Sequence, residues 1–431
     1  MGEWREKRLK TLIMIFMVIL ALMLFLDIYT FKGIRILLAN NSHSGLKKII
    51  FISYWTVTAF MIVLILTGYF FRSSTRNPAV FNWYFYLFGA FLVLYVPKIL
   101  FVAFHSTEDI LYGFAWMWKK IFVTKAIVAD GGTTITRSKF LSQIGLILAS
   151  LPFMAFIWGM VKGRFNFRVE HVKLTFPNLP KSFDGLKIAQ VSDIHIGSFN
   201  GFTTQVEEAI DMLNAQDADI LFFTGDLVNN FSEELEGWIP ILSRMKSKYG
   251  KYSILGNHDY GDYYKNWSSK EEKAENFKKI EEAHAEMGFQ LLNNQSVKLS
   301  RNGDEIAVIG CENWGHPPFP QYADFKKASE GTESMPFKIL LTHNPDHWDD
   351  KIQGQTDVDL TFSGHTHGMQ FGIRIAGTEL WSPAQYKYKH WAGLYKEGNQ
   401  FLYVNRGLGY IGYPGRVGMP PEITVIELKC S

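Results

Sequence analysis

Residues 186–195 read LKIAQVSDIH, a mostly apolar run followed directly by a serine, a carboxylate and an imidazole. A short apolar run bounded by polar residues predicts a buried strand, here 186–191. Asp193 and His195 then stand at its carboxyl end, one residue apart, so that both point to the same side of an extended chain. In open α/β sheets, ligands bind at this end of the strands. The stretch therefore predicts a strand that brings two metal-type ligands to one edge of a sheet.

The same order of strand, turn and ligand-type residues recurs four more times along the chain. The motifs after the later strands are TGD, GNHD, THNP and SGHTH. They supply these further candidate site residues: Asp226, Asn257, His258, Asp259, His343, His365 and His367. Any one motif is weak evidence, because a single histidine is more often structural than functional. Five motifs in order, each after a predicted strand, indicate one site where the strand ends converge.

The residue types indicate the chemistry of this site. Carboxylates, imidazoles and an amide oxygen form a mixed oxygen and nitrogen ligand set, which suits Mn²⁺, Fe or Zn²⁺ better than Ca²⁺. The set is too large for one ion, so we expect two divalent metal ions that share a bridging carboxylate, with Mn²⁺ favoured over Fe and Zn²⁺. Two ions roughly 3.5–4 Å apart can hold the attacking and leaving oxygens of a phosphoryl displacement.

The motifs D-x-H, GD, GNHD, H and GHTH resemble, in this order, the pattern of the calcineurin-like metallophosphoesterases over residues 185–370. The stretch YVNRGLG at 403–409, and Arg416 ahead of PPEI at 420–423, are similar to the C-terminal strands of the membrane-associated branch of that family. The resemblance implies a two-sheet sandwich with helices on both outer faces. The N-terminal region lies outside the resemblance.

The resemblance also implies a role for each matched residue. The first metal would be bound by Asp193, His195 and His367, the second by Asn257, His343 and His365, and Asp226 would bridge the two. His258 would stabilise the transition state or protonate the leaving oxygen, with Asp259 orienting it. Arg406 and Arg416 are candidate contacts to phosphate or a headgroup, because guanidinium pairs bidentately with phosphate. A surface or sheet-edge role for these two arginines stays open.

Two positions depart from the pattern common in the family. Gly368 is followed by Met369, where relatives often carry a second glycine. The Met369 side chain either narrows the site or packs against neighbours. Asp226 is followed by Leu-Val-Asn-Asn, so no second acid supports it there. The metal preference therefore stays open.

The first 161 residues contain four apolar runs of a length that suits membrane crossing, for which about 20 residues are needed. The runs lie near 11–29, 49–71, 78–97 and 140–161. A signal peptide is the alternative for the first run, but that run is long and no small-residue cleavage site follows it. Asp27 and Lys98 are expected at the membrane interface. Without an obvious charge pair inside the spans, residues 1–161 are predicted to be an anchor.

Four spans place both termini on one side of the membrane. The basic residues that precede the first run favour the cytoplasm for that side, while basic loops argue the other way. We expect an integral, multi-pass protein of the plasma or inner membrane, with a cytoplasmic catalytic domain favoured. Residues 105–139 mix aromatic residues with lysines, which suits either a membrane interface or a connecting helix.

Residues 162–431 alternate predicted strands and helices and end in a strand-rich half, which is an α/β pattern. Helices are expected over 203–216 and 232–248. Residues 260–287 are rich in Lys and Glu, which predicts a solvated helical face or, alternatively, a cap over the site. The net charge of +3 gives no support for nucleic-acid binding. Two distant cysteines, Cys311 and Cys430, imply no disulfide framework.

Together these features predict a membrane-anchored, binuclear metal-dependent phosphoesterase that cleaves a phosphodiester, phosphomonoester or pyrophosphate bond. The expected partners are membrane lipids and a phosphorylated substrate, with a lipid-linked UDP-diacylglucosamine type as one candidate. A catalytically silent metal-binding scaffold or receptor is the alternative, although His258 and every ligand position are present. A transporter gated by the soluble domain would need charged or broken helices at membrane depth.

Overall fold

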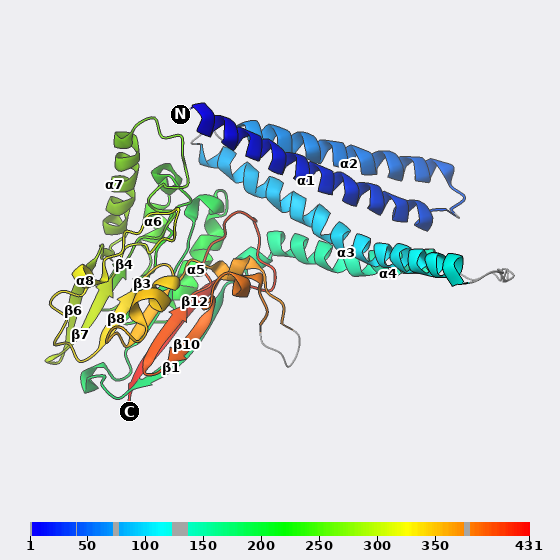
Figure 1. Cartoon of the computed structure of the whole chain (residues 1–431). Helices are drawn as coiled ribbons and strands as arrows, with labels where there is room; N and C mark the ends of the chain where they lie inside the picture. Colours follow the sequence, from blue (N-terminus) through cyan, green and yellow to red (C-terminus); the bar gives the residue numbers. More distant parts are fainter. Residues whose placement is uncertain (1, 40, 72–76, 123–136, 375–379) are drawn as a thin grey trace. The chain divides into compact units, whose positions relative to one another are not determined.

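The computed structural model describes residues 2–39, 41–71, 77–122, 137–374 and 380–431 (Figure 1). The chain divides into two compact units. The first consists of Met1–Arg72 and Leu87–Ile157, and the second of Ser73–Tyr86 and Trp158–Ser431. The start of the third long helix is thus grouped with the C-terminal unit.

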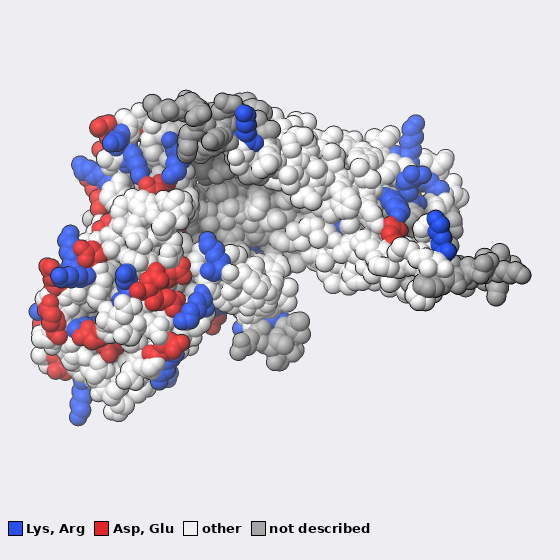
Figure 2. Space-filling model, viewed as in Figure 1, with Lys and Arg blue, Asp and Glu red and all other residues white. Residues whose placement is uncertain are grey.

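Four long helices dominate the N-terminal part of the chain, namely α1 (Gly2–Leu37), α2 (Ser44–Phe71), α3 (Pro78–Phe122) and α4 (Arg137–Val161). Their segments Phe16–Leu37, Ser44–Thr67, Asn82–Trp118 and Lys139–Val161 are long and apolar enough to cross a membrane. Figure 2 shows almost no charged side chains along the middle of these helices. The expected number of spans is therefore confirmed within the described residues.

The third helix is longer than the predicted span, which ended at Pro97. Helix α3 continues through Pro97 as far as Phe122. Proline removes one hydrogen bond from a helix, but a membrane offers the backbone no water as a substitute partner, so the apolar chain on both sides stays helical. Residues 105–122 of the aromatic and lysine-rich segment are thus helix, and residues 123–136 lie outside the described part.

A charged pair lies inside the helical unit, which corrects the expectation that Asp27 and Lys98 are interfacial. Asp27 is fully buried and forms an ion pair with Lys98, which comes from α3. Tyr54 and Tyr95 donate hydrogen bonds to the Asp27 carboxylate at 2.8 and 2.9 Å. These partners compensate the cost of burying the charge. The pair joins residues 71 positions apart, so local sequence patterns do not reveal it.

The second unit contains two six-stranded sheets, with strand orders β1-β12-β2-β3-β4-β5 and β10-β11-β9-β8-β7-β6. The strands of the first sheet are β1 (Arg168–Phe176), β2 (Lys187–Val191), β3 (Ile220–Phe223), β4 (Gly250–Ser253), β5 (Gln290–Leu291) and β12 (Glu422–Cys430). Those of the second are β6 (Gln295–Arg301), β7 (Asp304–Gly310), β8 (Lys338–Leu341), β9 (Leu360–Ser363), β10 (Gly393–Glu397) and β11 (Gln400–Val404). Strands β2, β3 and β4 are parallel neighbours, as are β8 and β9.

The sheets pack face to face, because alternate residues of each strand point to opposite sides. Ile188 and Phe222 of the first sheet share a buried cluster with Ile339 and Phe362 of the second. The outer face of the first sheet is covered by α5 (Thr203–Asn214) and α7 (Lys270–Glu286). The outer face of the second is covered by α8 (Phe325–Ala328) and the segment Trp348–Ile352. The expected two-sheet sandwich with helices on both outer faces is confirmed.

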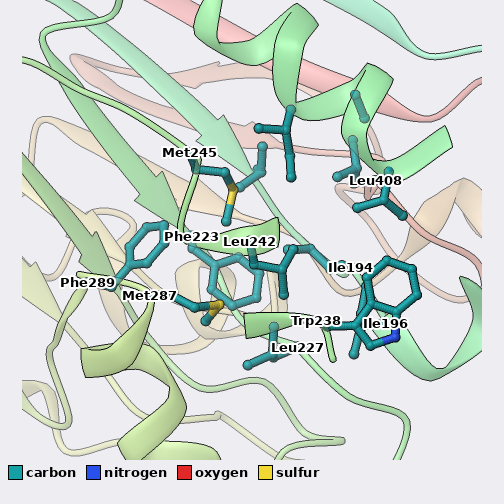
Figure 3. Packing of buried hydrophobic residues seen from close by; sticks show 14 of the residues in the cluster. Ile194, Ile196, Phe223, Leu227, Trp238, Leu242, Met245, Met287, Phe289 and Leu408 are labelled. Carbon is teal, nitrogen blue, oxygen red and sulfur yellow. The ribbon is translucent and has the colours of Figure 1, made fainter. Parts of the chain in front are cut away.

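One predicted helix is wrong. In place of a continuous helix over 232–248, the chain forms a short turn at Ser232–Leu235 and one helical turn, α6 (Ile239–Leu242). Gly237 between them has φ of +78°, which ends the helical path, and Pro240 cannot donate in the helix interior. The periodic apolar residues still reach the core, since Trp238, Leu242 and Met245 belong to the cluster drawn in Figure 3.

The buried face of α7 carries His284, whose side chain is fully buried. Its ring stacks on Phe223 with centroids 5.5 Å apart, and its Nδ1 lies 2.9 Å from the hydroxyl of Ser253. Burial lowers the pKa of His284 from its ordinary 6.5 to about 3. The unfolded chain therefore binds a proton here at pH values where the folded chain does not.

This difference predicts acid sensitivity of the fold. The contribution of neutral His284 is complete above pH 6.5. It falls by up to about 1.4 kcal/mol per pH unit as the pH drops from there toward the folded pKa. The His284→Leu variant should show a flatter fall of the thermal unfolding midpoint between neutral and mildly acidic pH, measured on the full chain in detergent. Equal slopes for both proteins would contradict this reading.

Candidate metal centre

The predicted ligands lie on loops that follow parallel strands, at one edge of the sandwich. Asp193 and His195 follow β2, Asp226 follows β3, Asn257 follows β4, His343 follows β8, and His365 and His367 follow β9. Because neighbouring parallel strands end at the same edge of a sheet, these loops converge. The structure thus brings together side chains that are up to 174 residues apart in the sequence.

The first group consists of Asp193, His195 and His367, whose ligand atoms all lie within 4.8 Å of one another and are buried. Nε2 of His367 lies 3.1 Å from Nε2 of His195 and 3.3 Å from Oδ1 of Asp193. Nδ1 of His195 lies 3.2 Å from the carbonyl oxygen of Val228. A carbonyl can only accept, so Nδ1 carries the proton and Nε2 offers its lone pair to the group.

The second group consists of Asp226, His343 and His365, again with ligand atoms within 4.8 Å. Oδ1 of Asn257 joins it, at 2.9 Å from Nε2 of His343 and 2.7 Å from Nδ1 of His365. Oδ2 of Asp226 lies 3.2 Å from Nε2 of His343 and 3.4 Å from Nε2 of His195 in the first group. Asp226 therefore lies between the two groups, where a shared carboxylate is needed.

The backbone at these ligands is strained. Left-handed φ values between 47° and 72° occur at Asp193, His195, Asp226, His365 and His367. A residue with a side chain pays of order 1–2 kcal/mol for such a conformation. Strain of this kind persists where the surrounding structure enforces it, and it gathers at functional sites. Five such positions among the ligands indicate that the fold is built around the site.

Two glycines of the motifs permit the close approach of the ligand loops. A Cβ at Gly364 would lie 2.0 Å from the hydroxyl of Ser192 and 2.3 Å from Oδ2 of Asp193. A Cβ at Gly256 would lie 2.2 Å from Oδ1 of Asp226. Neither distance is compatible with a side chain, so the glycines before the Asn-His and His-Thr-His pieces are required by the packing of the carboxylates.

Charges within the groups prepare them to bind cations. Burial acts to raise the pKa of Asp193, but the surrounding imidazoles outweigh it and hold that pKa far below its usual value. Burial lowers the pKa of His365 to about 3, which keeps this ring neutral. Metal ligands must be ionised carboxylates and neutral imidazoles. Burial acts to lower the pKa of His343, but the carboxylate of Asp226 outweighs it and raises that pKa to about 9, so this ring must lose its proton when a cation binds. The donor types and their burial thus fit two divalent cations.

His258 lies beside the first group, with its ring centroid 5.0 Å from that of His195. Its Nδ1 lies 2.7 Å from the carbonyl oxygen of Asn229, and its backbone N–H donates to Oδ1 of Asp226 at 2.8 Å. The predicted orienting partner is therefore wrong. The carbonyl of Asn229 orients the imidazole, and the carboxylate of Asp259 does not.

Asp259 has a different task, because its carboxylate accepts four backbone hydrogen bonds. Oδ2 accepts from the N–H groups of Gly256 and Asp226, and Oδ1 from those of Leu227 and Val228, at 2.8 to 3.2 Å. The carboxylate thus ties the loop after β3 to the loop after β4. The sequence placed Asp259 next to His258, and adjacency alone could not show that its side chain turns away.

Removal of the Asp259 carboxylate should lower the stability of the fold more than it impairs the chemical step. The Asp259→Ala variant leaves four buried N–H groups without their acceptor, each worth roughly 1–3 kcal/mol. We expect a clear fall in the thermal unfolding midpoint and a loss of bound metal. Asp259→Asn keeps one oxygen, so its unfolding midpoint and its metal content should lie between those of the wild-type chain and those of Asp259→Ala. If Asp259→Ala kept its stability and lost only turnover, the result would indicate a direct role of Asp259 in the reaction and contradict the structural role.

Two tyrosines complete the surroundings of the site, and no sequence motif marks them. The hydroxyl of Tyr388 lies 3.2 Å from Nε2 of His365, on the far side of the ring from the ligand group. The ring of Tyr263 stacks on His258 with centroids 4.3 Å apart, and Asn257 donates to its hydroxyl at 2.8 Å. That bond turns Oδ1 of Asn257 toward the second group. Neither tyrosine stands in a recurring motif.

The two arginines proposed as substrate contacts have protein partners. Arg406 forms ion pairs with Glu422 and with Glu170 on β1. Arg416 is 1% exposed, and its guanidinium donates to several backbone carbonyls, including that of Gly409 at 2.6 Å. These contacts favour a structural role for both side chains.

The fold and the two ligand groups define a metal-dependent phosphoric ester hydrolase in a membrane protein. The chain belongs to the calcineurin-like metallophosphoesterases. The family model described as "Calcineurin-like phosphoesterase" matches residues 186–369. A second model, "Probable Calcineurin-like phosphoesterase, transmembrane domain", matches residues 9–164. The second match covers the region that the resemblance seen in the sequence left out.

Similar proteins occur in distant organisms. YkuE of Bacillus subtilis, an uncharacterized metallophosphoesterase, is 32% identical over 261 residues, which cover 59% of this chain and 82% of that protein. A transmembrane protein with metallophosphoesterase domain from Danio rerio is 30% identical, covering 63% of this chain and 60% of that protein. The UDP-2,3-diacylglucosamine pyrophosphatase LpxG of Chlamydia trachomatis is 32% identical, covering 58% and 86%.

Proposed function

We propose that this protein hydrolyses the pyrophosphate bond of a nucleotide-linked, acylated lipid, with two Mn²⁺ ions as its working cofactor. Three features support the proposal. The ligand groups are complete, the chain has membrane helices, and a relative at 32% identity is named for UDP-2,3-diacylglucosamine. The observation that supports an acylated lipid as the substrate is an exposed apolar rim beside the ligand loop after β9.

This rim consists of large apolar side chains that are open to the surroundings. They are Met369, Ile373, Trp381 and Tyr386, which are 40%, 46%, 39% and 77% exposed. Met369 follows the ligand loop directly, and the hydroxyl of Ser382 donates to the carbonyl of Gly368 at 2.8 Å, which fixes the second half of the rim to the same loop. Exposed apolar clusters mark binding sites for apolar partners. An acyl chain next to the scissile bond suits this surface.

We assign the metal ligands as the geometry groups them. Asp193, His195 and His367 would hold one ion, Asn257, His343 and His365 would hold the other, and Asp226 would be shared. When bound, the two cations stabilise developing phosphoryl charge and make hydroxide available at neutral pH. The chain's own contribution is to fix the ligands and to place His258.

His258 is assigned as the proton donor to the leaving oxygen. Its Nδ1 is engaged by the carbonyl of Asn229, so only Nε2 is free to face a substrate. A neutral ring with its proton on Nδ1 has no proton on Nε2, and therefore the donating form is the imidazolium. Burial lowers the pKa of His258, whereas Asp226 and the carbonyl of Asn229 act to raise it. Burial outweighs the other two, so the ring is neutral at neutral pH and takes up the proton that it donates once the negative charge of a phosphate lies beside it.

The test is release of UMP from UDP-2,3-diacylglucosamine by the full chain in detergent with Mn²⁺. UDP-N-acetylglucosamine, which lacks the long acyl chains, is the matched substrate, and bis(p-nitrophenyl) phosphate reports the metal site alone. We expect UMP release from the acylated compound to exceed that from the unacylated one by at least about tenfold in kcat/KM. Hydrolysis of the diester without a preference for the acylated compound would exclude the lipid substrate and leave the phosphoesterase intact.

Variants of the rim sharpen this test. The double variant Trp381→Ser with Tyr386→Ser should raise KM for the acylated substrate and leave hydrolysis of the small diester unchanged. Tyr249→Ser is the control, because Tyr249 is 65% exposed but precedes β4, at the opposite end of that strand from the ligands. An equal effect of both changes would show that the rim has no part in substrate binding.

We also propose the cytoplasmic side of the plasma or inner membrane for the catalytic unit. The basic residues that precede the first span support this side. Protease added outside intact cells should then leave residues 162–431 undigested. Digestion of that region without lysis would place it on the other side.

A further inference from the structure

A cavity of about 620 Å³ lies between the end of α1 and the beginning of α2, in the helical unit. Its apolar wall includes Ile28, Phe31 and Phe51. Its polar lining includes the three cationic side chains Lys32, Arg35 and Lys47. No residue of the metal centre contributes to it. Figure 2 shows Lys and Arg side chains gathered at this end of the helices, next to the uncharged middle.

The cavity carries an excess of positive charge. Lys32 forms an ion pair with Asp109 at 2.6 Å. Lys47 donates to the carbonyl oxygen of Ala39 at 2.9 Å, and no carboxylate among the described residues pairs with it. Arg35 has no carboxylate partner in the part of the chain that the structure describes. Three cations and one carboxylate give a local charge of +2, so the cavity is suited to an anion.

The position of the cavity indicates which kind of anion it would bind. The spans Phe16–Leu37 and Ser44–Thr67 end and begin here, so the cavity lies at the boundary between hydrocarbon and headgroups. Phe31 packs against Phe51 and Trp55 with ring centroids 4.9 and 5.3 Å apart, which makes a rigid apolar wall. A molecule that fills this space needs a negative headgroup and an apolar body. A cationic lining at headgroup depth attracts the phosphate of an anionic lipid by charge, on whichever face of the membrane it lies.

A neighbouring cavity provides a contrast. It has a volume of about 350 Å³, shares Leu38 with the first, and is lined by apolar residues together with Thr30 and Lys98. Lys98 is already paired with the buried carboxylate of Asp27. That cavity therefore has no spare charge for an anion. The cationic lining of the first cavity is thus a property of that place and not of every space in the unit.

We propose that the cavity between α1 and α2 binds an anionic membrane phospholipid, with its phosphate on Arg35 and Lys47 and its glycerol and acyl part on Phe31 and Phe51. With four spans, the connection between α1 and α2 lies at the membrane face opposite to the one where α1 begins and α4 ends. No residue that lines the cavity belongs to either ligand group, so we infer a lipid that is resident in the helical unit. The proposal is independent of the identity of the substrate.

The experiment uses the full chain in nanodiscs that contain phosphatidylglycerol and phosphatidylcholine. The protein is then released from the nanodiscs and analysed by native mass spectrometry. The spectra should show phosphatidylglycerol bound to the protein and little bound phosphatidylcholine. In the double variant Arg35→Gln with Lys47→Gln, the amount of bound phosphatidylglycerol should fall at least about tenfold. Lys48→Gln with Lys10→Gln is the matched control, because it removes two charges that do not line the cavity and should retain the lipid. Hydrolysis of bis(p-nitrophenyl) phosphate should be the same in all three proteins.

A second measurement does not depend on the variants. Phosphatidylglycerol added to the detergent-solubilised wild-type chain should raise its thermal unfolding midpoint, since a ligand of the folded state stabilises it, and phosphatidylcholine should not. Equal effects of both lipids, equal loss in the cavity variant and its control, or equal protection by inorganic phosphate would overturn the proposal. Failure of the substrate test described above, with lipid retention intact, would leave it standing.

Discussion

Asp226→Ala is expected to abolish hydrolysis of bis(p-nitrophenyl) phosphate, with a loss of at least about 10³-fold in kcat/KM. Oδ2 of Asp226 lies 3.4 and 3.2 Å from imidazole nitrogens of the two different groups. A carboxylate in this place would contribute a ligand to both ions. Its removal should therefore empty both positions, and not one, and bound metal should fall well below that of the wild-type chain.

The matched control is Asp219→Ala. Asp219 directly precedes β3, the strand that Asp226 follows, so the two residues lie at opposite ends of that strand, and Asp219 is also largely buried. Its carboxylate accepts from the backbone N–H of Lys187 at 2.9 Å and lies outside both groups. Metal content and turnover should be nearly those of the wild-type chain in this variant. Retention of both metals and of turnover within tenfold in Asp226→Ala would refute the bridging role.

His258→Ala is expected to lose roughly 10²–10⁴-fold in turnover while it keeps both metals, since a positioned proton donor contributes about that much. The loss should depend on the leaving group. Phenyl phosphodiesters need a proton on the departing oxygen more than p-nitrophenyl ones, whose leaving group is a weaker base. The variant should therefore lose considerably more activity on the phenyl compound.

His316→Ala is the control for this comparison, because His316 is half-exposed, pairs with Asp346 through its Nε2 and belongs to neither ligand group. It should retain turnover on both compounds. Equal losses for both leaving groups in His258→Ala would remove the proton-donor role and leave transition-state stabilisation as the alternative. A loss of metal would assign His258 to the ligands.

The ligands themselves could be predicted because each one follows a buried strand. Apolar runs such as 220–223 mark the strand, and the residue after the turn is then placed by the geometry of a parallel sheet. The edge strands were harder. β5, β6 and β10 have exposed or partly exposed residues and lack a continuous apolar run, so periodicity alone did not reveal them.

The residues around the ligands could not be predicted for a different reason. Tyr388 and Tyr263 reach the site through tertiary contacts, and no local pattern sets them apart from other tyrosines. Asp259 and His258 are neighbours in sequence whose side chains serve different partners. The buried pair of Asp27 and Lys98 joins two helices whose packing is not encoded in either one. Sequence motifs therefore locate the reacting groups better than their supports.

The measurement that tests the central claim most directly is a titration of the metal-free full chain with Mn²⁺ in detergent, in which bound metal and hydrolysis of bis(p-nitrophenyl) phosphate are followed together. The paired ligand groups predict that turnover is nearly absent in the metal-free chain and reaches its maximum only when two ions are bound per chain. Full turnover at one bound ion, or turnover that does not depend on metal, would contradict a binuclear phosphoesterase.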